Sequence, residues 1–384
     1  MKAPLEGYRV LDWTIYHQGP IAAAHLADLG AEVIKIEPPE GDPGRKMLEK
    51  LGVDAPLNFY FHNNNRGKKS IVLDLEDNKG KEILYKLVEK SDVFITNHLY
   101  KDAKRLKVDY ETLSKHNPKL IYTACSGYGL EGPEADKPGD DLLIQARAGI
   151  IRYASGVDGT PTAVGAGFSE AVGGVAAAYG TLVALFTRER TGIGQLVDTS
   201  MFGAALEMLR EWVSFYASSG KPPSISVLGQ TSSPLWYFYG CKDGKWVVLS
   251  VLQPDRFWHD FCAVVGIAHL ADDPKFKDAA ARRTNLAEIL PIVKEKMLTK
   301  TRDEWLKLFA EKNIAAAPMN DMSTLQDDQQ VKANEYFVEV NDPRYGKVKV
   351  PSSLVKPSKT PGKITRLAPE LGEHTKEVLK SLGL

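Results

Sequence analysis

Predicted strands and helices alternate along the first half of the chain, and this alternation limits the fold more than any other feature of the sequence. Short apolar runs rich in β-branched residues predict strands at 8–12, 31–37, 70–75, 92–96 and 120–124. Helical patterns lie between them, and the first begins at Gly19-Pro20 and ends at Gly30. Strands interleaved with helices pack as a parallel sheet covered by helices. The sequence therefore predicts an α/β fold.

A charge-free apolar run, AVGGVAAAYGTLVALF, follows Glu170. It is shorter than the ~20 residues of a bilayer-spanning helix and ends in Arg188-Glu189-Arg190, so we expect a helix buried in a protein core. Ser169 is a favoured N-cap residue and would place Glu170 in the first turn. Acids are common in first turns, so position alone does not identify a site. The glycines at 165 and 167 single it out, because they let a ligand approach a carboxylate that can act as a nucleophile.

Composition argues against several other classes of function. The 384 residues carry 49 basic and 49 acidic side chains, so no net charge attracts nucleic acid or an anionic membrane. The three cysteines are far apart, and the eight histidines form no HxxxH or HExxH pattern, so we expect no metal site. The first residues lack the apolar core of a signal peptide. We therefore expect a reduced, cytoplasmic protein without a metal, nucleic-acid or membrane partner.

The segment 127–132 has the GxGxxG spacing of a dinucleotide-binding loop directly after a predicted strand. Such a site needs these glycines to open a helix, whose N-terminus binds the pyrophosphate. Pro133 and Pro138 follow closely and prevent that helix, so we interpret the segment as a loop. The sequence also contains no GxSxG nucleophile turn and no P-loop.

Two further polar positions stand next to predicted elements. His17 lies at the turn between the first strand and the first helix, where it can line a site at the carboxyl end of the sheet, although an ordinary loop histidine fits equally well. Asp140-Asp141 precede a predicted helix at 142–148 and are most simply N-cap residues. These residues alone predict an α/β enzyme with a carboxylate at the start of a core helix, and no particular substrate.

Several segments resemble the class III CoA-transferases, the family of formyl-CoA and carnitine CoA-transferases that also contains the α-methylacyl-CoA racemases. The resemblance extends over almost the whole chain and rests on segments 10–14, 19–20, 26–37, 64–70, 91–97, 127–129 with 132–133, 190–195 with 197–198, and 371–375. It implies a large Rossmann-like domain built from both chain ends, a smaller central domain, and an interlaced homodimer with its site at the interface.

A linker-like segment at 220–224 and this resemblance together predict three parts of the chain. Residues 1–219 form the first part of the large domain. Residues 220–325 form a small α+β domain, with two strands around a turn at 242–244 and helices at 256–265, 284–298 and 302–312. Residues 326–384 form a crossing segment, extended at 340–365, and the C-terminal part of the large domain with a helix at 376–381.

The family resemblance implies transfer of CoA from an acyl-CoA donor to a carboxylic acid in two half-reactions. A carboxylate attacks the thioester to give a mixed anhydride, and the released thiolate returns to form an enzyme–CoA thioester that the acceptor attacks. The family aspartate that performs this attack stands four residues before a glycine. Glu170 matches it here, with Gly174 four residues on. Since a misplacement of about 1 Å can cost about 100-fold, we expect the site to have adapted to the longer glutamate.

The same comparison implies residues that bind CoA. Asn97 and Arg105 match positions that hold its phosphates and nucleotide. Leu73 and Tyr128 match positions along the adenine and pantetheine, and His17 with Gln18 match residues near the thioester, where Gln18 would hold the acyl oxygen. Two departures concern these contacts: Pro38 stands where an arginine is common, and Leu99-Tyr100 replaces a Pro-Gly type of turn. The predicted CoA-binding residues are His17, Gln18, Leu73, Asn97, Arg105 and Tyr128.

Two alternatives stay open. A racemase would shuttle a proton with a histidine before the residue that matches Asp141, but Asp140 stands there and is a poor substitute. A chain that binds CoA as a non-catalytic subunit would need a related catalytic partner. The sequence does not identify the two acids.

Overall fold

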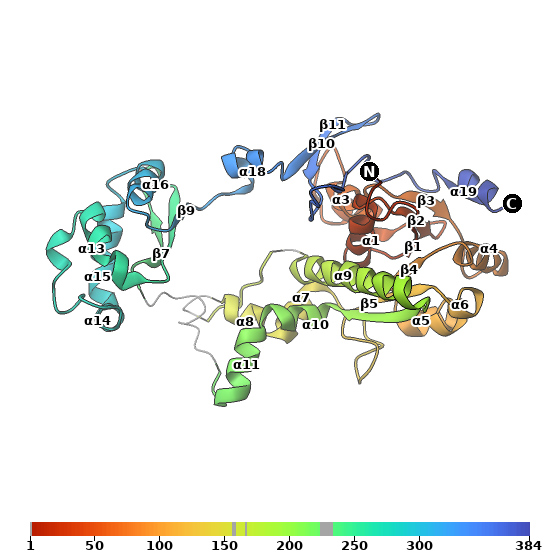
Figure 1. Cartoon of the computed structure of the whole chain (residues 1–384), viewed down its shortest axis with the longest axis horizontal. Helices are drawn as coiled ribbons and strands as arrows, with labels where there is room; N and C mark the ends of the chain where they lie inside the picture. Colours follow the sequence, from red (N-terminus) through yellow and green to blue (C-terminus); the bar gives the residue numbers. More distant parts are fainter. Residues whose placement is uncertain (1, 156–158, 166, 223–232) are drawn as a thin grey trace. The chain divides into compact units, whose positions relative to one another are not determined.

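A computed structural model of the chain describes residues 2–155, 159–165, 167–222 and 233–384. The chain forms two compact units, which Figure 1 shows by their elements. One unit contains Met1–Ile151, Ala163–Ser214 and Gln330–Leu384, and the other contains Arg152–Thr162 and Phe215–Gln329. Each unit therefore joins segments that are distant in sequence.

The first unit is organised around a six-stranded sheet with the order β3-β2-β1-β4-β5-β6. Each neighbouring pair is parallel, as in Val10 of β1, which lies between Val33 of β2 and Val93 of β4. This arrangement confirms the predicted α/β fold, and the predicted strand positions agree to within a few residues. The strands are β1 (Arg9–Trp13), β2 (Glu32–Glu37), β3 (Lys69–Val72), β4 (Val93–Thr96), β5 (Ile121–Ser126) and β6 (Gln195–Ser200).

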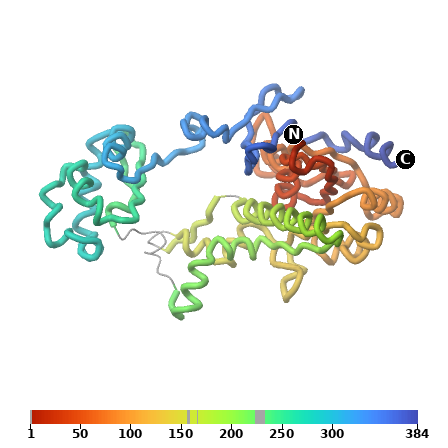
Figure 2. Tube along the Cα trace, in the orientation of Figure 1, coloured from red at the N-terminus to blue at the C-terminus, as the bar shows by residue number. Residues whose placement is uncertain are grey.

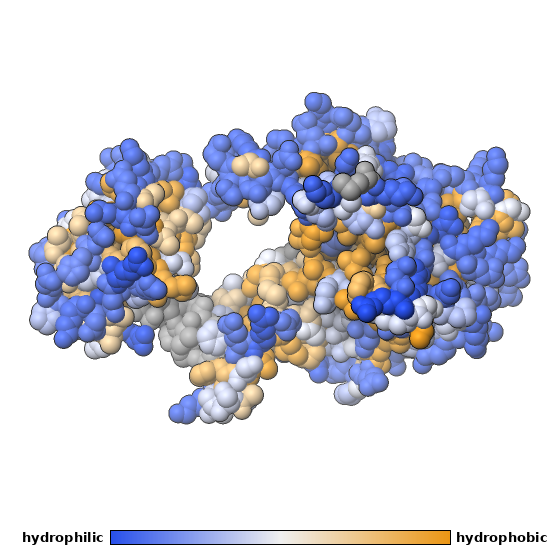
Figure 3. All heavy atoms as spheres, viewed as in Figure 1, coloured by the Kyte–Doolittle hydropathy of each residue, from blue (hydrophilic) through white to orange (hydrophobic). Residues whose placement is uncertain are grey.

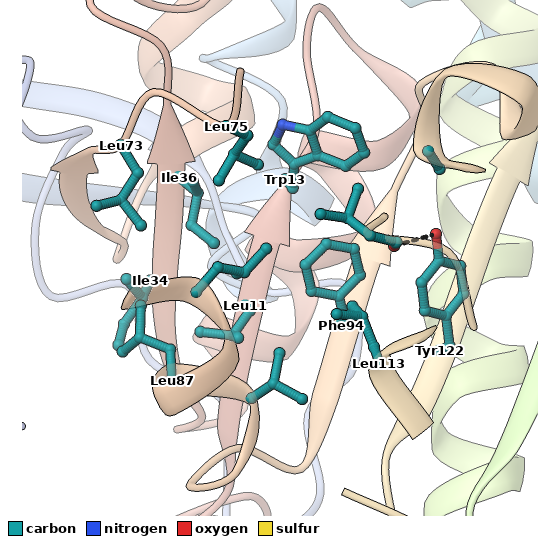
Figure 4. Packing of buried hydrophobic residues seen from close by; sticks show 14 of the residues in the cluster. Leu11, Trp13, Ile34, Ile36, Leu73, Leu75, Leu87, Phe94, Leu113 and Tyr122 are labelled. Carbon is teal, nitrogen blue, oxygen red and sulfur yellow. Dashed lines mark hydrogen bonds between the residues drawn. The ribbon is translucent and has the colours of Figure 1, made fainter. Parts of the chain in front are cut away.

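Helices cover both faces of this sheet, so the unit has three layers (Figure 1). Small residues of α1 (Gln18–Asp28) and α9 (Phe168–Thr191) pack on one face, which explains how these two helices can lie close together. The other face carries the larger core in Figure 4, where Leu11, Phe94 and Leu87 meet. Its helices are α4 (Asn78–Val88), α5 (Tyr100–Leu106), α6 (Tyr110–His116) and α19 (Thr375–Ser381).

The remaining elements of this unit are short or peripheral. The segment 127–132 contains no helix, which confirms its interpretation as a loop. The helical segment after β6 is interrupted at Leu209 and forms two helices. These elements are η1 (Pro43–Lys46), α2 (Met47–Lys50), α3 (Phe59–Asn65), α7 (Asp141–Ala148), α8 (Ile150–Ala154, which continues past this unit), α10 (Met201–Met208), α11 (Arg210–Ser219, which also continues past it) and α18 (Gln329–Ala333).

The C-terminal segment returns to the N-terminal strands, as Figure 2 shows by its colours. The Gly67 amide donates to the Arg366 carbonyl at 3.1 Å, and the His374 amide donates to the Ser70 carbonyl at 2.9 Å. The expected extended segment at 340–365 contains secondary structure that the sequence analysis did not include. Its first part forms a hairpin of β10 (Phe337–Asp342) and β11 (Gly346–Pro351), because alternate valines of both strands pack on Leu367.

Helix α9 packs on the sheet as the expected core helix, but in the single chain only one of its faces is buried. Ala177, Ala178, Ala184 and Leu185 pack into the core, whereas the opposite side carries an exposed apolar stripe. The uniformly apolar sequence hid this difference between faces. By length and composition alone, α9 is also the one described helix that could cross a membrane. The stripe consists of Val175, Tyr179, Val183 and Phe186.

The second unit has its own core around a three-stranded sheet. Strands β7 (Trp236–Gly240) and β8 (Trp246–Ser250) are antiparallel, as predicted around the turn at 242–244, and β9 (Ala316–Pro318) pairs with β8. Trp258 and Trp305 are fully buried against this sheet's inner side. Part of the predicted linker at 220–224 lies outside the described residues. The helices are α13 (Pro254–Val265), η2 (Ala268–Leu270), α14 (Ala279–Thr284), α15 (Leu286–Met297), α16 (Arg302–Glu311) and α17 (Met322–Leu325).

Two partly buried histidines of the first unit predict a loss of stability in mild acid. Burial lowers the pKa of His25, and likewise of His98, to about 4. In the unfolded chain an imidazole titrates near 6.5, so the unfolded chain binds more protons between pH 6.5 and 4. The stability is therefore complete above pH 6.5 and falls toward pH 4, by at most about 1.4 kcal/mol per pH unit for each imidazole.

The melting temperature should therefore decrease between pH 7 and pH 5, before most carboxylates titrate. In the variant His25→Gln the melting temperature should decrease less steeply with falling pH. The control His116→Gln, a change at a partly exposed histidine, should behave as the wild type. A melting temperature that stays constant or rises over this range would contradict the assignment of two partly buried, neutral imidazoles.

Candidate active site

A cavity of about 300 Å³ lies at the carboxyl ends of β1, β4 and β5. The strand order reverses between β1 and β4, and in open parallel sheets this reversal leaves a crevice where ligands bind. Loops after three strands line the cavity, with Glu170 of α9 beside them. Lining residues that matter below are Tyr16, Gln18, Asn97, Ser126 and Glu170.

The loop after β1 has a strained backbone that polar side chains hold in place. Tyr16 has φ 64°, a conformation that residues other than glycine rarely adopt. The Asn97 side chain binds both backbone groups of Ile15, the residue before Tyr16. Its Oδ1 accepts from the Ile15 amide at 2.8 Å, and its Nδ2 donates to the Ile15 carbonyl at 2.7 Å. The Tyr16 amide donates to Asp42 Oδ1 at 3.2 Å. The loop is therefore fixed at the strained residue and at the residue before it.

Fully buried ion pairs lie beneath this loop. Lys35 Nζ is 2.8 Å from Asp42 Oδ2 and donates to the Thr14 carbonyl at 2.8 Å. Lys68 Nζ is 2.7 Å from Asp12 Oδ2. Buried charges are tolerated only when such partners replace water, so these pairs fix the relative positions of β1, β2 and the loop.

The start of α9 is capped from another helix rather than by its own side chain. The N-cap is Gly167, with φ 78°, and helix α9 begins at Phe168. Asp141 of α7 accepts from the Gly167 amide at 2.9 Å and from the Ser169 amide at 2.6 Å. The prediction that Ser169 is the N-cap was therefore wrong, because a carboxylate distant in sequence takes that role. Glu170 nevertheless lies in the first turn, as predicted.

His17 and Glu170, which are 153 residues apart, meet at this point. His17 Nδ1 lies 2.8 Å from Glu170 Oε2. The His17 ring also lies 5.3 Å from the ring of Tyr60, centroid to centroid. Burial, with a smaller contribution from the Glu170 carboxylate, raises the pKa of the Tyr60 phenol well above its usual value, so Tyr60 is a neutral neighbour. The Glu170 carboxylate therefore lines the cavity, and the His17 imidazole contacts that carboxylate.

A site with one acid at a helix start, set against a parallel sheet, is shared by many enzymes, and sequence comparison decides between them. The family described as "CoA-transferase family III" matches residues 5–375. The chain belongs to CoA-transferase family III. It is thus an enzyme of CoA transfer, and enzymes of this kind use CoA thioesters as substrates.

Named relatives of this CoA-transferase act on different acids. It is 33% identical to "(R)-2-hydroxy-4-methylpentanoate CoA-transferase" of Clostridioides difficile, over 99% of this chain and 95% of the relative. It is 35% identical to "Acetyl-CoA:oxalate CoA-transferase" of Acetobacter aceti, over 97% and 94%. "Succinyl-CoA:glutarate CoA-transferase" of Mus musculus is 30% identical, over 99% and 86%.

Solved structures show the same fold over the whole CoA-transferase. A CAIB/BAIF family protein from Brucella suis has a TM-score of 0.88 and 30% identity, and the similarity covers 100% of both chains. The structure of Rv3272 from M. tuberculosis has a TM-score of 0.85 and 27% identity, over 97% of this chain and 98% of that one.

The residues predicted to bind CoA lie in different surroundings, and their roles stay predictions. Gln18 and Asn97 line the cavity with Glu170, and His17 contacts Glu170. The described lining of this cavity includes none of the other three. Leu73 is buried in the core (Figure 4). Arg105 lies on the surface, where a guanidinium nitrogen is 2.8 Å from Glu76 Oε1. The centroid of the Tyr128 ring lies 5.1 Å from Arg147 Cζ.

Sequence reasoning missed several residues that shape the site of this CoA-transferase. Asp141 resembled an ordinary N-cap residue, and only the fold shows that its carboxylate caps α9. Asp42 and Tyr60 belong to no sequence motif. The available signal was Lys35, because a charged residue within the apolar strand β2 needs a buried partner, which is Asp42. Among the described residues, no group of three or more His, Cys, Asp and Glu could hold a metal ion.

Proposed function

We propose that this enzyme moves CoA from an acyl-CoA to a carboxylic acid through covalent intermediates on Glu170. One observation carries the proposal: the Glu170 carboxylate lines the cavity at the carboxyl edge of the sheet, in the first turn of α9. The N-terminal end of a helix favours an ionised carboxylate, and the ionised form is the nucleophile.

Each half-reaction conserves one high-energy bond. A Glu170 oxygen attacks the thioester carbonyl carbon, the C–S bond breaks, and the CoA thiolate leaves a mixed anhydride behind. The thiolate then attacks the glutamyl carbonyl carbon, which releases the donor acid and gives a glutamyl–CoA thioester. The acceptor carboxylate repeats the two steps in reverse order, so acyl-CoA forms and Glu170 is regenerated. Water must be excluded throughout, because it would hydrolyse either intermediate.

Gln18 is placed to assist these steps. Its side chain lines the same cavity, and its Nε2 lies 3.5 Å from the Ser126 carbonyl. A Cβ on Gly173 would stand only 3.0 Å from this Nε2, so the glycine gives the amide room beside Glu170. An amide donor here would stabilise the oxyanion that develops on the acyl oxygen.

Proton transfer of the racemase type is the weaker alternative. Asp140, which stands where a racemase has its histidine, is exposed, and its Oδ1 accepts from the Leu143 amide at 3.0 Å as the N-cap of α7. It is therefore engaged in capping and is poorly suited to act as a base in a dry site.

The purified protein alone should exchange CoA between two acids. Incubation with each of a panel of acyl-CoAs and a labelled carboxylic acid should yield labelled acyl-CoA, with parallel-line double-reciprocal plots. Exchange of the C2 hydrogen with deuterated solvent, without CoA transfer, would indicate the racemase alternative. Transfer that requires a second, related chain would indicate a non-catalytic subunit.

We also propose that the enzyme is a homodimer that buries the apolar stripe of α9. Figure 3 shows hydrophobic residues gathered in the region of α9, and the stripe of Val175, Tyr179, Val183 and Phe186 is exposed in the single chain. A soluble protein rarely leaves such a stripe in water.

A cytoplasmic location suits the three buried, unpaired cysteines, Cys125, Cys241 and Cys262.

Charge on the stripe should therefore disrupt the dimer. Light scattering of the wild type should give twice the mass of the chain, and Tyr179→Glu should shift the protein toward the monomer. The matched control Leu51→Glu places the same charge at another exposed apolar residue and should stay dimeric. A wild-type monomer, or a Tyr179→Glu dimer of unchanged affinity, would contradict this interface.

A further inference from the structure

His17 touches Glu170 without belonging to the cavity that Glu170 lines. The two side chains are 18% and 19% exposed, and the contact between Nδ1 and Oε2 is 2.8 Å long. Tyr16, Gln18 and Glu170 line the cavity, whereas His17 is not among its described lining residues. A carboxylate accepts hydrogen bonds and has no proton to donate, so Nδ1–H is the donor. His17 thus contacts the Glu170 carboxylate from outside the described lining of the cavity.

The position of the His17 ring is fixed from several sides. Its carbonyl accepts from the Ile21 amide at 2.9 Å in the first turn of α1, and the loop before it is held by Asn97. One ring face lies near Tyr60. The ring also lies directly against Gly167, where a Cβ would be only 2.2 Å from His17 Cε1. Glycine at the N-cap of α9 is what lets the imidazole reach Glu170.

Glu170 needs a hydrogen-bond donor such as His17 because backbone amides at the start of α9 are already bound to Asp141. Carboxylates at helix starts are often held by free backbone amides, but Asp141 accepts from the amides of Gly167 and Ser169. A glutamate also has one more rotatable bond than an aspartate, so its carboxylate samples more positions. A donor at a fixed position removes this freedom and directs the second oxygen toward the cavity.

We infer that His17 is a positioning residue for Glu170, which holds one carboxylate oxygen so that the other is presented to the acyl-CoA. This inference rests on the proposed role of Glu170 as the nucleophile. It is compatible with the family resemblance, which implies only that His17 lies near the thioester. The hydrogen bond from His17 fixes the position of the Glu170 carboxylate, which the longer side chain would otherwise leave variable.

The rate of acylation of Glu170 tests this role directly. The protein is mixed with a reactive acyl-CoA and hydroxylamine, and hydroxamate on the peptide that contains residue 170 is followed by mass spectrometry. His17→Ala should slow this rate about 100-fold, as expected for a nucleophile displaced by about 1 Å, while the Kd for CoA changes little. The control His116→Ala should leave both unchanged.

Conservative replacements identify the nitrogen that matters. The side-chain amide nitrogen of Asn occupies the place of Nδ1, whereas that of Gln occupies the place of Nε2. His17→Asn should therefore restore most of the rate and His17→Gln should not. If His17→Ala fails to fold, this comparison still decides, because equal rates for the Asn and Gln variants would overturn the inference.

A double-mutant cycle separates positioning from a general structural role. Asp at 170 is too short to reach His17, so His17→Ala should cost less than about 3-fold in a Glu170→Asp background. An equal cost in both backgrounds would overturn the inference, and so would an unchanged rate for His17→Ala. If the proposed function itself fails, the label appears on another residue or persists in Glu170→Gln, which is a distinguishable result.

Discussion

The variant Glu170→Gln should transfer CoA at least about 10,000-fold more slowly than the wild type, because the amide that replaces the carboxylate is not a nucleophile. The amide keeps the size of the side chain, and its oxygen can still accept from His17 Nδ1–H, so the fold and the Kd for CoA should stay the same. The rate is measured as acyl-CoA formed from a donor acyl-CoA and a free acid. Glu207→Gln, a change at an exposed glutamate of α10, is the matched control.

Glu170→Asp is the informative intermediate case. Aspartate retains the nucleophile but places it about one bond length away, and it should lose the contact with His17. We expect a loss on the order of 100-fold, much less than for Gln. If Glu170→Gln retains more than one hundredth of the wild-type rate, another residue carries the chemistry.

Asp12→Ala should destabilise the first unit by about 3–5 kcal/mol, because it leaves the buried ammonium of Lys68 without its counter-charge. Lys68 is fully buried, and besides Asp12 it donates to the Pro20 carbonyl and to Asn65 Oδ1, both at 2.9 Å. Burial lowers the pKa of Lys68 to about 8, against the opposing effect of Asp12. The ammonium is therefore charged at neutral pH in the wild type. Its pKa falls further in Asp12→Ala, so folding of the variant must either bury the charge unpaired or deprotonate it.

Removal of both charges should restore much of the loss. In Asp12→Ala/Lys68→Met no unpaired charge stays buried, so the double variant should be more stable than Asp12→Ala alone. Glu288→Ala breaks the exposed pair with Lys275 and should change stability little. An Asp12→Ala variant as stable as this surface control would show that the buried pair contributes nothing to the fold.

The layered fold was predictable because each local pattern agreed with the others. Strands of the sheet are short apolar runs between helical segments, so both the α/β class and the strand positions followed from periodicity. The burial of α9 was less predictable, because a helix that is apolar on all sides does not reveal which side packs on the sheet. The β10–β11 hairpin was missed for another reason: prolines and lysines around it suggested extended chain, although Val338, Val340, Val348 and Val350 alternate as in strands.

Some residues of the candidate site could be predicted from the sequence, but their contacts could not. Glu170 was singled out by the glycines before it at a helix start, and His17 became a candidate from its strand-to-helix turn. Their contact across 153 residues depends on how α1 and α9 pack against each other, which no local pattern records. Asp141 likewise replaced Ser169 as the cap of α9 through tertiary structure. Local sequence rules describe what a side chain can do, while its partner is set by the fold.

The most direct test of the central claim is a peptide map of the wild-type enzyme after reaction with its acyl-CoA donor. We expect a CoA adduct, or a hydroxamate after hydroxylamine, on the peptide that contains Glu170, and none in Glu170→Gln. An enzyme that transfers CoA at full rate with no modification at Glu170 would contradict the covalent mechanism.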